Sequence, residues 1–494
     1  MRHFHSVGST NALMSVPVAL LALVAFGCSG PDPQQAQEVL SAASGSGDQG
    51  AQTSPSVPAA SGTGDAGSPS APAIGPDAVG SGSDAGPAVD TAPPPNPVAP
   101  MADAAPAKSS DPPVPPMPEA APPPKPAAPM ASATTSPSPV PAPSAAGLSL
   151  RVVGNHLVDA SATTVRLLGV NRSGQEFKCV QEGSATSLGW GIFDGPTDLA
   201  SVKAIASWHA NTVRIPLNED CWLGINGVNP SYGGAAYQAA IAGYVSTIHQ
   251  AGLYVILDLH WNAPGAVVAG SQQPLPDADH AVDFWKSVAK TFSSDQAVVF
   301  DLYNEPFLYG TYMQSSGGDP WDCWLNGCGL NQYMTGGNPY TQAYAWNTVG
   351  MQTLVNTIRA VGATNPLMVG GLAWANDLSE WLTHEPKDPL NAIIASWHSY
   401  PGETCDAASC WTSTVAPVAL QVPVVTGEIG DNVAGAATYV DSLLPWEDAH
   451  GISYVGWTWN AWGDSSNILI ADYTGTPTAN FGQKFHDHLV GLNP

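Results

Sequence analysis

Two glutamates, Glu305 and Glu428, each follow a run of apolar residues that predicts a buried strand. The first stands in the triplet Asn304-Glu305-Pro306 and the second in the stretch VVTGEIG. Cleavage of a glycosidic bond needs a carboxylic acid that protonates the leaving oxygen, and a second carboxylate that acts as nucleophile or activates water. The pair therefore predicts glycoside hydrolysis if the fold brings both side chains together. For either residue alone, a solvated loop position is the ordinary alternative.

The elements that must position these glutamates alternate between strands and helices from about residue 147 onward. Eight apolar runs have the composition of strands that are buried on both faces; they are Val165–Val170, Thr212–Leu217, Tyr254–Leu259, Ala297–Tyr303, Leu367–Gly371, Ile393–Trp397, Val422–Thr426 and Ser453–Trp457. Apolar residues recurring every three or four positions predict helices at Leu199–Trp208, Tyr237–Gln250, Ala281–Thr291, Tyr344–Ala360, Ala436–His450 and Asn480–Val490. This alternation predicts an α/β fold, a (β/α)8 barrel of the TIM type. An open doubly wound sheet is the alternative, but no glycine-rich phosphate loop follows the first strand.

In such a barrel the reactive residues lie at the carboxyl ends of the strands. The residues expected there, in chain order, are Arg214, His260-Trp261, Asn304-Glu305-Pro306, His398-Ser399-Tyr400, Glu428 and Trp457-Thr458-Trp459. The ends of the fourth and seventh strands face each other across the barrel mouth, which can place two carboxyl groups about 5 to 5.5 Å apart. That separation specifies retention of the anomeric configuration.

The stretches VVFDLYNEP and VVTGEIG resemble the acid/base and nucleophile motifs of glycoside hydrolase family 5, the cellulase family. LLGVNRSG, NTVRIPLN, VILDLHW, ASWHSY and YVGWTWN also resemble blocks of that family, in the family's order. The resemblance covers residues 147–494, and seven ordered blocks are far more specific than one Asn-Glu-Pro triplet.

The resemblance implies that Glu305 is the general acid/base and that Glu428 is the nucleophile. It also implies that Asn304 binds the 2-hydroxyl of the substrate. Arg214 would lie beside the nucleophile and Tyr400 would donate a hydrogen bond to it, and both effects lower the pKa of a carboxylate. Glu305 instead needs a raised pKa, so that it carries a proton at working pH.

The resemblance further places His260 and His398 around the scissile bond and gives Trp457 the role of an aromatic platform under the distorted sugar. Trp459 is the second candidate for that platform. Trp374 is the first choice among the additional tryptophans that could line a glucan cleft; the others are Trp222, Trp261, Trp321, Trp324 and Trp462.

Each of these residues also has a structural alternative. Arg214 could form an ordinary ion pair, the two histidines could be core residues with satisfied hydrogen bonds, and tryptophans pack in cores more often than they bind ligands. Asp258 and Asp301 lie within predicted strands, and we expect internal hydrogen bonding from them, without a catalytic role.

The first 146 residues differ sharply in composition from the rest of the chain. Residues 1–27 have the weakly basic start and short apolar run of a signal peptide. The stretch before Cys28 resembles a bacterial lipoprotein signal, which predicts lipidation of Cys28; cleavage and free secretion is the alternative. Residues 28–146, rich in Pro, Ala, Ser and Gly, predict a disordered, extended linker that tethers a catalytic domain at 147–494. The protein is therefore expected to be exported, either to the cell surface as an outer-membrane lipoprotein or into the medium.

The formal net charge of −26, with only 14 Lys and Arg, limits the kinds of molecule that the protein can bind. Nucleic acid is excluded as a partner and acidic polysaccharides are disfavoured, whereas a neutral β-linked polysaccharide is compatible. Membrane contact is expected only through the lipid anchor. The oligomeric state cannot be read from the sequence, and a monomer is assumed.

The chain has seven cysteines, and lipidation of Cys28 leaves six in the globular part. The spacing of Cys323 with Cys328 and of Cys405 with Cys410 suits small disulfide loops. Cys179 and Cys221 remain as a third candidate pair. No metal-ligand spacing is evident, so we expect neither a metal nor another cofactor.

The leading hypothesis is an endo-acting β-1,4-glucanase. Other members of the family act on mannan, xyloglucan or β-1,3-glucan, and some are exo-acting, so the backbone preference stays open. A non-catalytic, surface-anchored glycan-binding lipoprotein is the hypothesis of a different class.

Overall fold

The structure is a computed structural model, and the residues that it describes are 147–180, 191–308, 310–315, 317–334, 341–431, 437–463 and 467–492. The predicted signal peptide (1–27), the lipidation site Cys28 and the linker (28–146) lie outside the described residues. In the described ranges, no helix has both the length and the apolar character that crossing a membrane requires.

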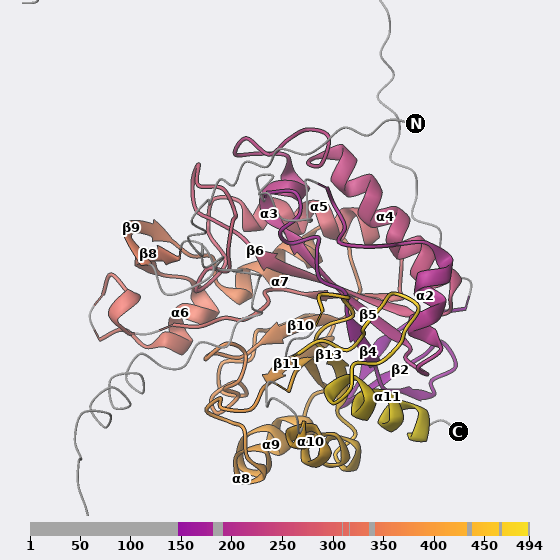
Figure 1. Cartoon of the computed structure of the whole chain (residues 1–494). Helices are drawn as coiled ribbons and strands as arrows, with labels where there is room; N and C mark the ends of the chain where they lie inside the picture. The colour runs from indigo at the N-terminus through magenta and orange to yellow at the C-terminus, as the bar shows by residue number, and fades with distance from the viewer. Residues whose placement is uncertain are drawn as a thin grey trace, which may run out of the picture. The chain divides into compact units, whose positions relative to one another are not determined.

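Eight parallel strands close into a barrel in the order β10-β11-β12-β13-β4-β5-β6-β7, which confirms the predicted fold (Figure 1). The strands are β4 (Leu168–Asn171), β5 (Thr212–Asn218), β6 (Tyr254–Trp261), β7 (Val298–Asp301), β10 (Leu367–Gly370), β11 (Ile393–Ser399), β12 (Val424–Ile429) and β13 (Ser453–Gly456). Each predicted strand is present within a few residues of its expected bounds. Arg214 was expected at a strand end but lies in the middle of β5, because pairing between β5 and β6 continues as far as Asn218.

The amino-terminal end of the barrel is closed by a small antiparallel sheet of β1 (Arg151–Val153), β2 (His156–Val158) and β3 (Thr164–Val165). Leu150 and Leu157 from this segment are buried against an apolar layer inside the barrel. The other residues of that layer are Leu167, Tyr254, Ile256, Ala297, Val299, Met368, Ile394 and Val425. The barrel interior is therefore lined by apolar side chains at this end.

Helices surround the barrel (Figure 1), and most of them bury apolar residues in the core that covers the outside of the strands. They are α2 (Leu199–Ala206), α3 (Glu219–Leu223), α4 (Ala235–Gln250), α5 (Ala281–Phe292), α6 (Pro320–Asn326), α7 (Met351–Ala360), α8 (Ala408–Cys410), α9 (Ala416–Ala419), α10 (Thr438–Ala449) and α11 (Phe481–Leu492), with the single turns η1 (Gly310–Tyr312) and η2 (Trp411–Val415). Local capping fixes where some of them begin: Asp198 accepts a hydrogen bond from the backbone nitrogen of Ser201 at the start of α2.

The long connection after β7 departs from the sequence prediction. We expected a helix from Tyr344 to Ala360, but α7 begins only at Met351. The preceding residues form β9 (Thr341–Asn347), which pairs with β8 (Gly329–Met334) in an antiparallel hairpin. The spacing of the apolar residues in this stretch fits either a helix or a strand, and pairing with β8 stabilises the strand.

Three disulfides join the six cysteines of the domain, as expected. Cys323–Cys328 and Cys405–Cys410 close loops of equal sequence separation. Cys179–Cys221 ties the connection after β4 to α3 at the end of β5. All three lie in connections outside the barrel strands, so they fix loops and not the barrel itself.

Candidate active site

Arg214 occupies the centre of the polar part of the barrel interior and is fully buried. Its Nη1 donates to Oε1 of Glu428 over 2.9 Å. The other partners of the guanidinium are Asn171 at 3.0 Å, Asp258 at 3.1 Å, Asp301 at 3.0 Å and Asn304 at 2.8 Å. Asp258 and Asp301 are thus internal hydrogen-bonding residues, as predicted. Arg214 does form ion pairs, but one of its partners is the predicted nucleophile.

The guanidinium of Arg214 contacts three carboxyl groups, and one positive charge cannot balance three negative ones. The three carboxyl groups must therefore differ in how readily they bind a proton. Burial raises the pKa of Asp258 to about 7 although Arg214 opposes it, and burial likewise raises the pKa of Asp301 to about 7. The Oδ1 atoms of Asp258 and Asp301 have no hydrogen-bond partner. Both oxygens of Glu428, in contrast, accept a hydrogen bond. Glu428 is therefore the best stabilised anion of the three, and the two aspartates are the groups that hold protons near neutral pH.

Glu428 lies near the end of β12, where its carboxylate is held between Arg214 and Tyr400. The Tyr400 hydroxyl donates to Oε2 of Glu428 over 2.7 Å. We expected these two contacts to lower the pKa of Glu428, and each does; burial nevertheless outweighs them, so the net shift of its pKa is upward. Burial and the nearby Glu428 also raise the pKa of Tyr400, which keeps the phenol in its donating form.

His398, at the end of β11, stands between the two glutamates. Its Nδ1 is 3.0 Å from Oε1 of Glu305 and 3.8 Å from Oε2 of Glu428. One ligand atom of each of these three residues lies within 4.8 Å of the other two. That proximity agrees with the separation of about 5 to 5.5 Å that retaining enzymes use, and not with the roughly 6.5 to 9.5 Å of inverting ones. Burial lowers the pKa of His398, with Arg214 and His260 adding to the effect, so its ring is neutral.

The two glycines of VVTGEIG make room for the rings that contact the glutamates. A Cβ on Gly427 would lie 2.7 Å from Nε2 of His398, and a Cβ on Gly430 would lie 2.3 Å from Cε1 of Tyr400. Real Cβ atoms do not approach so closely. Glycine on either side of Glu428 therefore lets both rings pack directly against β12.

His260 and Trp457 form a second part of the barrel mouth. Their rings stack in parallel with centroids 5.6 Å apart, and Nδ1 of His260 is 2.7 Å from Oδ2 of Asp258. Burial lowers the pKa of His260 to about 4, so this histidine is neutral as well. The carboxylate of Glu176 lies close enough to oppose that shift, although burial raises its own pKa.

The structure separates the two candidates for the aromatic platform. Trp457 lies beside His260, whereas the indole of Trp459 is 1% exposed and packs edge-on against Trp208, with ring centroids 4.6 Å apart. Trp208 belongs to the helix layer. Trp459 is therefore a core residue and not part of the mouth; both tryptophans follow the end of β13 at Gly456, so the alternation of a strand does not set the direction of their side chains.

The additional tryptophans divide into two groups. Trp374 is partly exposed and stacks on Phe307, with ring centroids 3.8 Å apart and an interplanar angle of 15°. Trp261 and Trp462 are also partly exposed, whereas Trp222, Trp321 and Trp324 are buried. Three of these six tryptophans are therefore exposed enough to contact a ligand.

Sequence reasoning missed two polar residues of the site. Asn171 ends β4 and accepts from Arg214; its place at the end of the block LLGVN could have identified it. Gln272 accepts from Nδ2 of Asn304 over 2.9 Å and donates to the backbone oxygen of Glu305 over 2.8 Å. It stands in the long connection after β6, where no pattern in the sequence marks it.

Within the described part of the chain, two groups of side chains have the spacing of metal ligands. One is Glu305, His398 and Glu428, and the other is the largely exposed set of Asp319, Glu380 and His384. An ion between the two buried glutamates would occupy the space that a substrate carbon must enter for nucleophilic attack. The first group is therefore better suited to proton transfer and attack than to a resident metal.

Comparison with known proteins agrees with this geometry. The family model described as cellulase, glycosyl hydrolase family 5, matches residues 170–463. A manganese dependent endoglucanase of Phanerodontia chrysosporium is 27% identical over 220 residues, which are 43% of this chain and 45% of the relative. A mannan endo-1,4-β-mannosidase of Cellvibrio japonicus is 23% identical over 279 residues, 54% of this chain and 52% of the relative. The chain thus spans about half the length of these curated relatives.

Solved structures share the fold at low sequence identity. A β-glucanase of Saccharophagus degradans in complex with cellotetraose has a TM-score of 0.52 and 21% identity, covering 73% of this chain and 99% of that one. An endocellulase of Pyrococcus horikoshii has a TM-score of 0.51 and 18% identity, covering 71% and 99%. At such identities the likeness establishes the (β/α)8 barrel and nothing finer.

Proposed function

Because the chain belongs to the cellulase family, glycosyl hydrolase family 5, we propose that it is a retaining endo-β-1,4-glucanase with Glu428 as nucleophile and Glu305 as general acid/base. The observation that carries the proposal is the placement of two buried glutamates within 4.8 Å, with His398 between them. Neutral glucans suit a chain of net charge −26, which would repel polyanionic substrates.

The first step is attack of a Glu428 oxygen on the anomeric carbon while Glu305 gives its proton to the leaving oxygen. The bond to the leaving group breaks and an ester to Glu428 forms. In the second step Glu305, now ionised, takes a proton from water, and the water oxygen displaces Glu428 from the same anomeric carbon. The two inversions together retain the configuration.

The surroundings of Glu428 support this cycle. Arg214 and Tyr400 donate to its two oxygens and hold the carboxylate in one orientation for attack. Asn304, fixed by Arg214 and Gln272, is the group assigned to the 2-hydroxyl of the sugar. Trp457, and Trp374 stacked on the buried Phe307, supply aromatic surface for sugar faces.

The experiment that tests the proposal compares initial rates on a soluble cellulose derivative, mannan, xyloglucan and laminarin. We expect the highest rate on the β-1,4-glucan and internal cleavage, seen as a rapid fall in viscosity for few reducing ends released. Activity confined to mannan would support a mannanase instead, which is the activity named for the Cellvibrio japonicus relative.

The catalytic assignment is tested by two isosteric variants. Glu428→Gln should abolish turnover on every substrate and leave binding measurable by calorimetry, because it removes the attacking anion. Glu305→Gln should spare aryl glycosides whose leaving groups need no protonation. Undiminished hydrolysis by Glu428→Gln would show that Glu428 is not the nucleophile, whereas glycan binding by the wild type without any hydrolysis would support the non-catalytic alternative.

We expect no metal requirement, because the carboxylates supply both the proton and the nucleophile. Dialysis against a chelator should leave the rate unchanged. A rate restored only by added Mn²⁺ would instead align this chain with the manganese dependent relative.

We further propose that the enzyme is exported and anchored by a lipid on Cys28, with residues 28–146 as tether; a monomer is assumed. Incorporation of labelled palmitate into the full chain, lost in Cys28→Ala, would support the anchor. Release of an unlabelled protein into the medium would support free secretion.

A further inference from the structure

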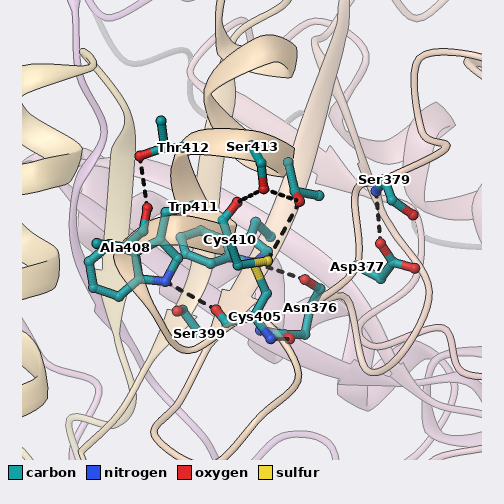
Figure 2. Close-up of a disulfide and its surroundings, with 12 residues drawn as sticks. Asn376, Asp377, Ser379, Ser399, Cys405, Ala408, Cys410, Trp411, Thr412 and Ser413 are labelled. Atoms are coloured by element: carbon teal, nitrogen blue, oxygen red, sulfur yellow. Dashed lines mark hydrogen bonds between the residues drawn. A yellow bond between two sulfur atoms is a disulfide. The ribbon is translucent and has the colours of Figure 1, made fainter. Parts of the chain in front are cut away.

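The side chain of Asn376 joins two segments that carry residues of the active site. Asn376 lies in the connection after β10 and is 1% exposed. Its Nδ2 donates to the backbone oxygen of His398 over 2.9 Å. Its Oδ1 accepts from the backbone nitrogen of Cys405 over 2.7 Å; both of these residues are labelled in Figure 2. One amide therefore fixes the end of β11 against the loop that follows Tyr400.

That loop is itself closed and anchored. Cys405 is bonded to Cys410, and the indole nitrogen of Trp411 donates to the backbone oxygen of Cys405 over 3.1 Å (Figure 2). Trp411 is buried. The partner that Asn376 holds is therefore a fixed point and not a free loop end.

The other side of Asn376 is anchored through a left-handed turn. Ala373, Trp374 and Ala375 have φ values of 52°, 63° and 58°, a conformation that costs about 1–2 kcal/mol for each residue with a side chain. Two hydrogen bonds hold it: the backbone nitrogen of Trp374 donates to Pro306 over 3.0 Å, and that of His398 donates to Ala375 over 3.0 Å. The turn thus connects the residue after Glu305 with His398.

We propose that Asn376 is a positioning residue that sets the geometry of the catalytic pair. It touches neither glutamate. It holds the backbone of His398, whose ring is 3.0 Å from Glu305, and it holds the loop that begins directly after Tyr400, whose hydroxyl is 2.7 Å from Glu428. This inference rests on the proposed function of the same site.

Asn376→Ala is the primary variant, and Asn365→Ala is its matched control. Asn365 is also fully buried in a loop next to β10, but at the opposite end of that strand. Its Nδ2 donates to the backbone oxygens of Asp295 and Val298 over 2.7 and 2.9 Å. Both substitutions remove a buried amide that bridges backbone groups, so both should lower the melting temperature by a similar amount.

The two variants should differ in kcat when the rates are measured on folded enzyme. We expect Asn376→Ala to lose about 10- to 100-fold in kcat with KM near the wild-type value, since small misplacement of catalytic groups costs rates of this order. The loss should be larger for a substrate with a poor leaving group than for a dinitrophenyl glycoside, because the direct hydrogen bond is to His398, which contacts the acid Glu305. Asn365→Ala should retain the wild-type kcat on both.

A second pair of variants keeps the test decisive if Asn376→Ala does not fold. The double substitution Cys405→Ser/Cys410→Ser releases the loop that Asn376 holds, whereas Cys323→Ser/Cys328→Ser releases a loop of the same sequence separation at α6. We expect only the first double variant to lower kcat.

The outcomes distinguish this inference from the proposed function. If the wild type hydrolyses no β-glycan, the proposed function is wrong. If the wild type is active and Asn376→Ala keeps the kcat of Asn365→Ala, or loses equally on both leaving groups, the positioning role is wrong while the function stands. If both disulfide variants keep the wild-type kcat, the loop has no part in positioning and the inference is overturned.

Discussion

The two ends of the barrel interior differ in kind although the same strands build both. At the amino-terminal end the inward residues are apolar, among them Ile256, Val299 and Ile394. Two residues further along the same strands stand Asp258, Asp301 and Ser396, all fully buried. Because inward positions alternate, the change from apolar to polar takes place over roughly 7 Å of strand.

The comparison shows how buried charge is tolerated. The apolar end is sealed by Leu150 and Leu157 and needs no hydrogen bonds from its side chains. The mouth end buries charged side chains, and a cluster of them surrounds Arg214, whose guanidinium contacts five side chains. The apolar end therefore contributes packing alone, whereas the mouth end carries the chemistry, and the following predictions test this contrast in order of expected effect.

Removal of the central cation should give the largest effect. Arg214→Met leaves Asp258, Asp301 and Glu428 buried without a counter-charge, so we expect a loss of at least about 10²- to 10³-fold in kcat/KM and a destabilisation of about 3–5 kcal/mol. Rates on folded enzyme and urea unfolding measure the two effects.

Its control is Arg359→Met. Arg359 forms a bidentate ion pair with Asp388 at 2.8 and 2.9 Å, at α7 in the helix layer. The variant should lose stability and keep its kcat. If both arginine variants lost activity equally, the contrast between the two regions would not hold.

Substitutions of the two tryptophans that follow β13 should give the next largest effects, one on activity and the other on stability. Trp457→Ala removes ring surface beside His260, and we expect about a tenfold loss in kcat/KM, equivalent to 1.4 kcal/mol of transition-state binding. Trp459→Ala should instead cost about 3–5 kcal/mol of stability, as large-to-small core substitutions do. Steady-state kinetics and thermal unfolding of both variants measure the two effects. A normal Tm together with lost activity for Trp459→Ala would contradict the assignment of Trp459 to the core.

Much of this contrast could be predicted from the sequence. The apolar runs located all eight barrel strands, and Glu305, His398 and Glu428 were identified because each ends or follows such a run. One particular error concerns the position of Arg214. Arg214 was expected at a strand end although the predicted strand ran on to Leu217, and in the structure β5 continues as far as Asn218.

The remaining site residues could not be predicted, because tertiary contacts alone identify them. Gln272 stands in a connection without periodicity, and Asn376 acts through backbone groups of residues that are distant in sequence. The net direction of the pKa of Glu428 was also beyond sequence reasoning, since it depends on how burial weighs against Arg214.

Successive inward positions on one strand allow a finer test of the two ends. Ile394→Ala, in the apolar layer, should cost about 2–5 kcal/mol of unfolding free energy. Ser396→Ala, two residues toward the mouth, removes a buried hydroxyl that has no hydrogen-bond partner, so stability should stay the same or rise by about 1 kcal/mol. Chemical unfolding of both variants measures this. Equal losses would show that packing, not polarity, dominates at both positions.

The smallest effect concerns a carboxyl at the mouth end that Arg214 does not reach. Glu219, at the start of α3, is fully buried; burial raises its pKa well above the usual value, and Asp277 and Asp220 add to the rise. A carboxyl whose folded pKa lies above its unfolded value binds protons more strongly in the folded state. Its contribution to stability is therefore present at low pH and is lost progressively as pH rises above the unfolded value of about 4.5.

Glu219→Gln keeps the shape of the protonated form and cannot ionise. We expect the variant to match the wild type in Tm near pH 4.5 and to exceed it by a few degrees at pH 8, with about 2–4 °C for each kcal/mol. Glu380→Gln is the control for the substitution itself, since Glu380 is exposed and the change removes no buried carboxyl. A constant difference for Glu219→Gln would mean that Glu219 is ionised in the folded protein throughout this range, and that the mouth tolerates more unbalanced charge than Arg214 alone can offset.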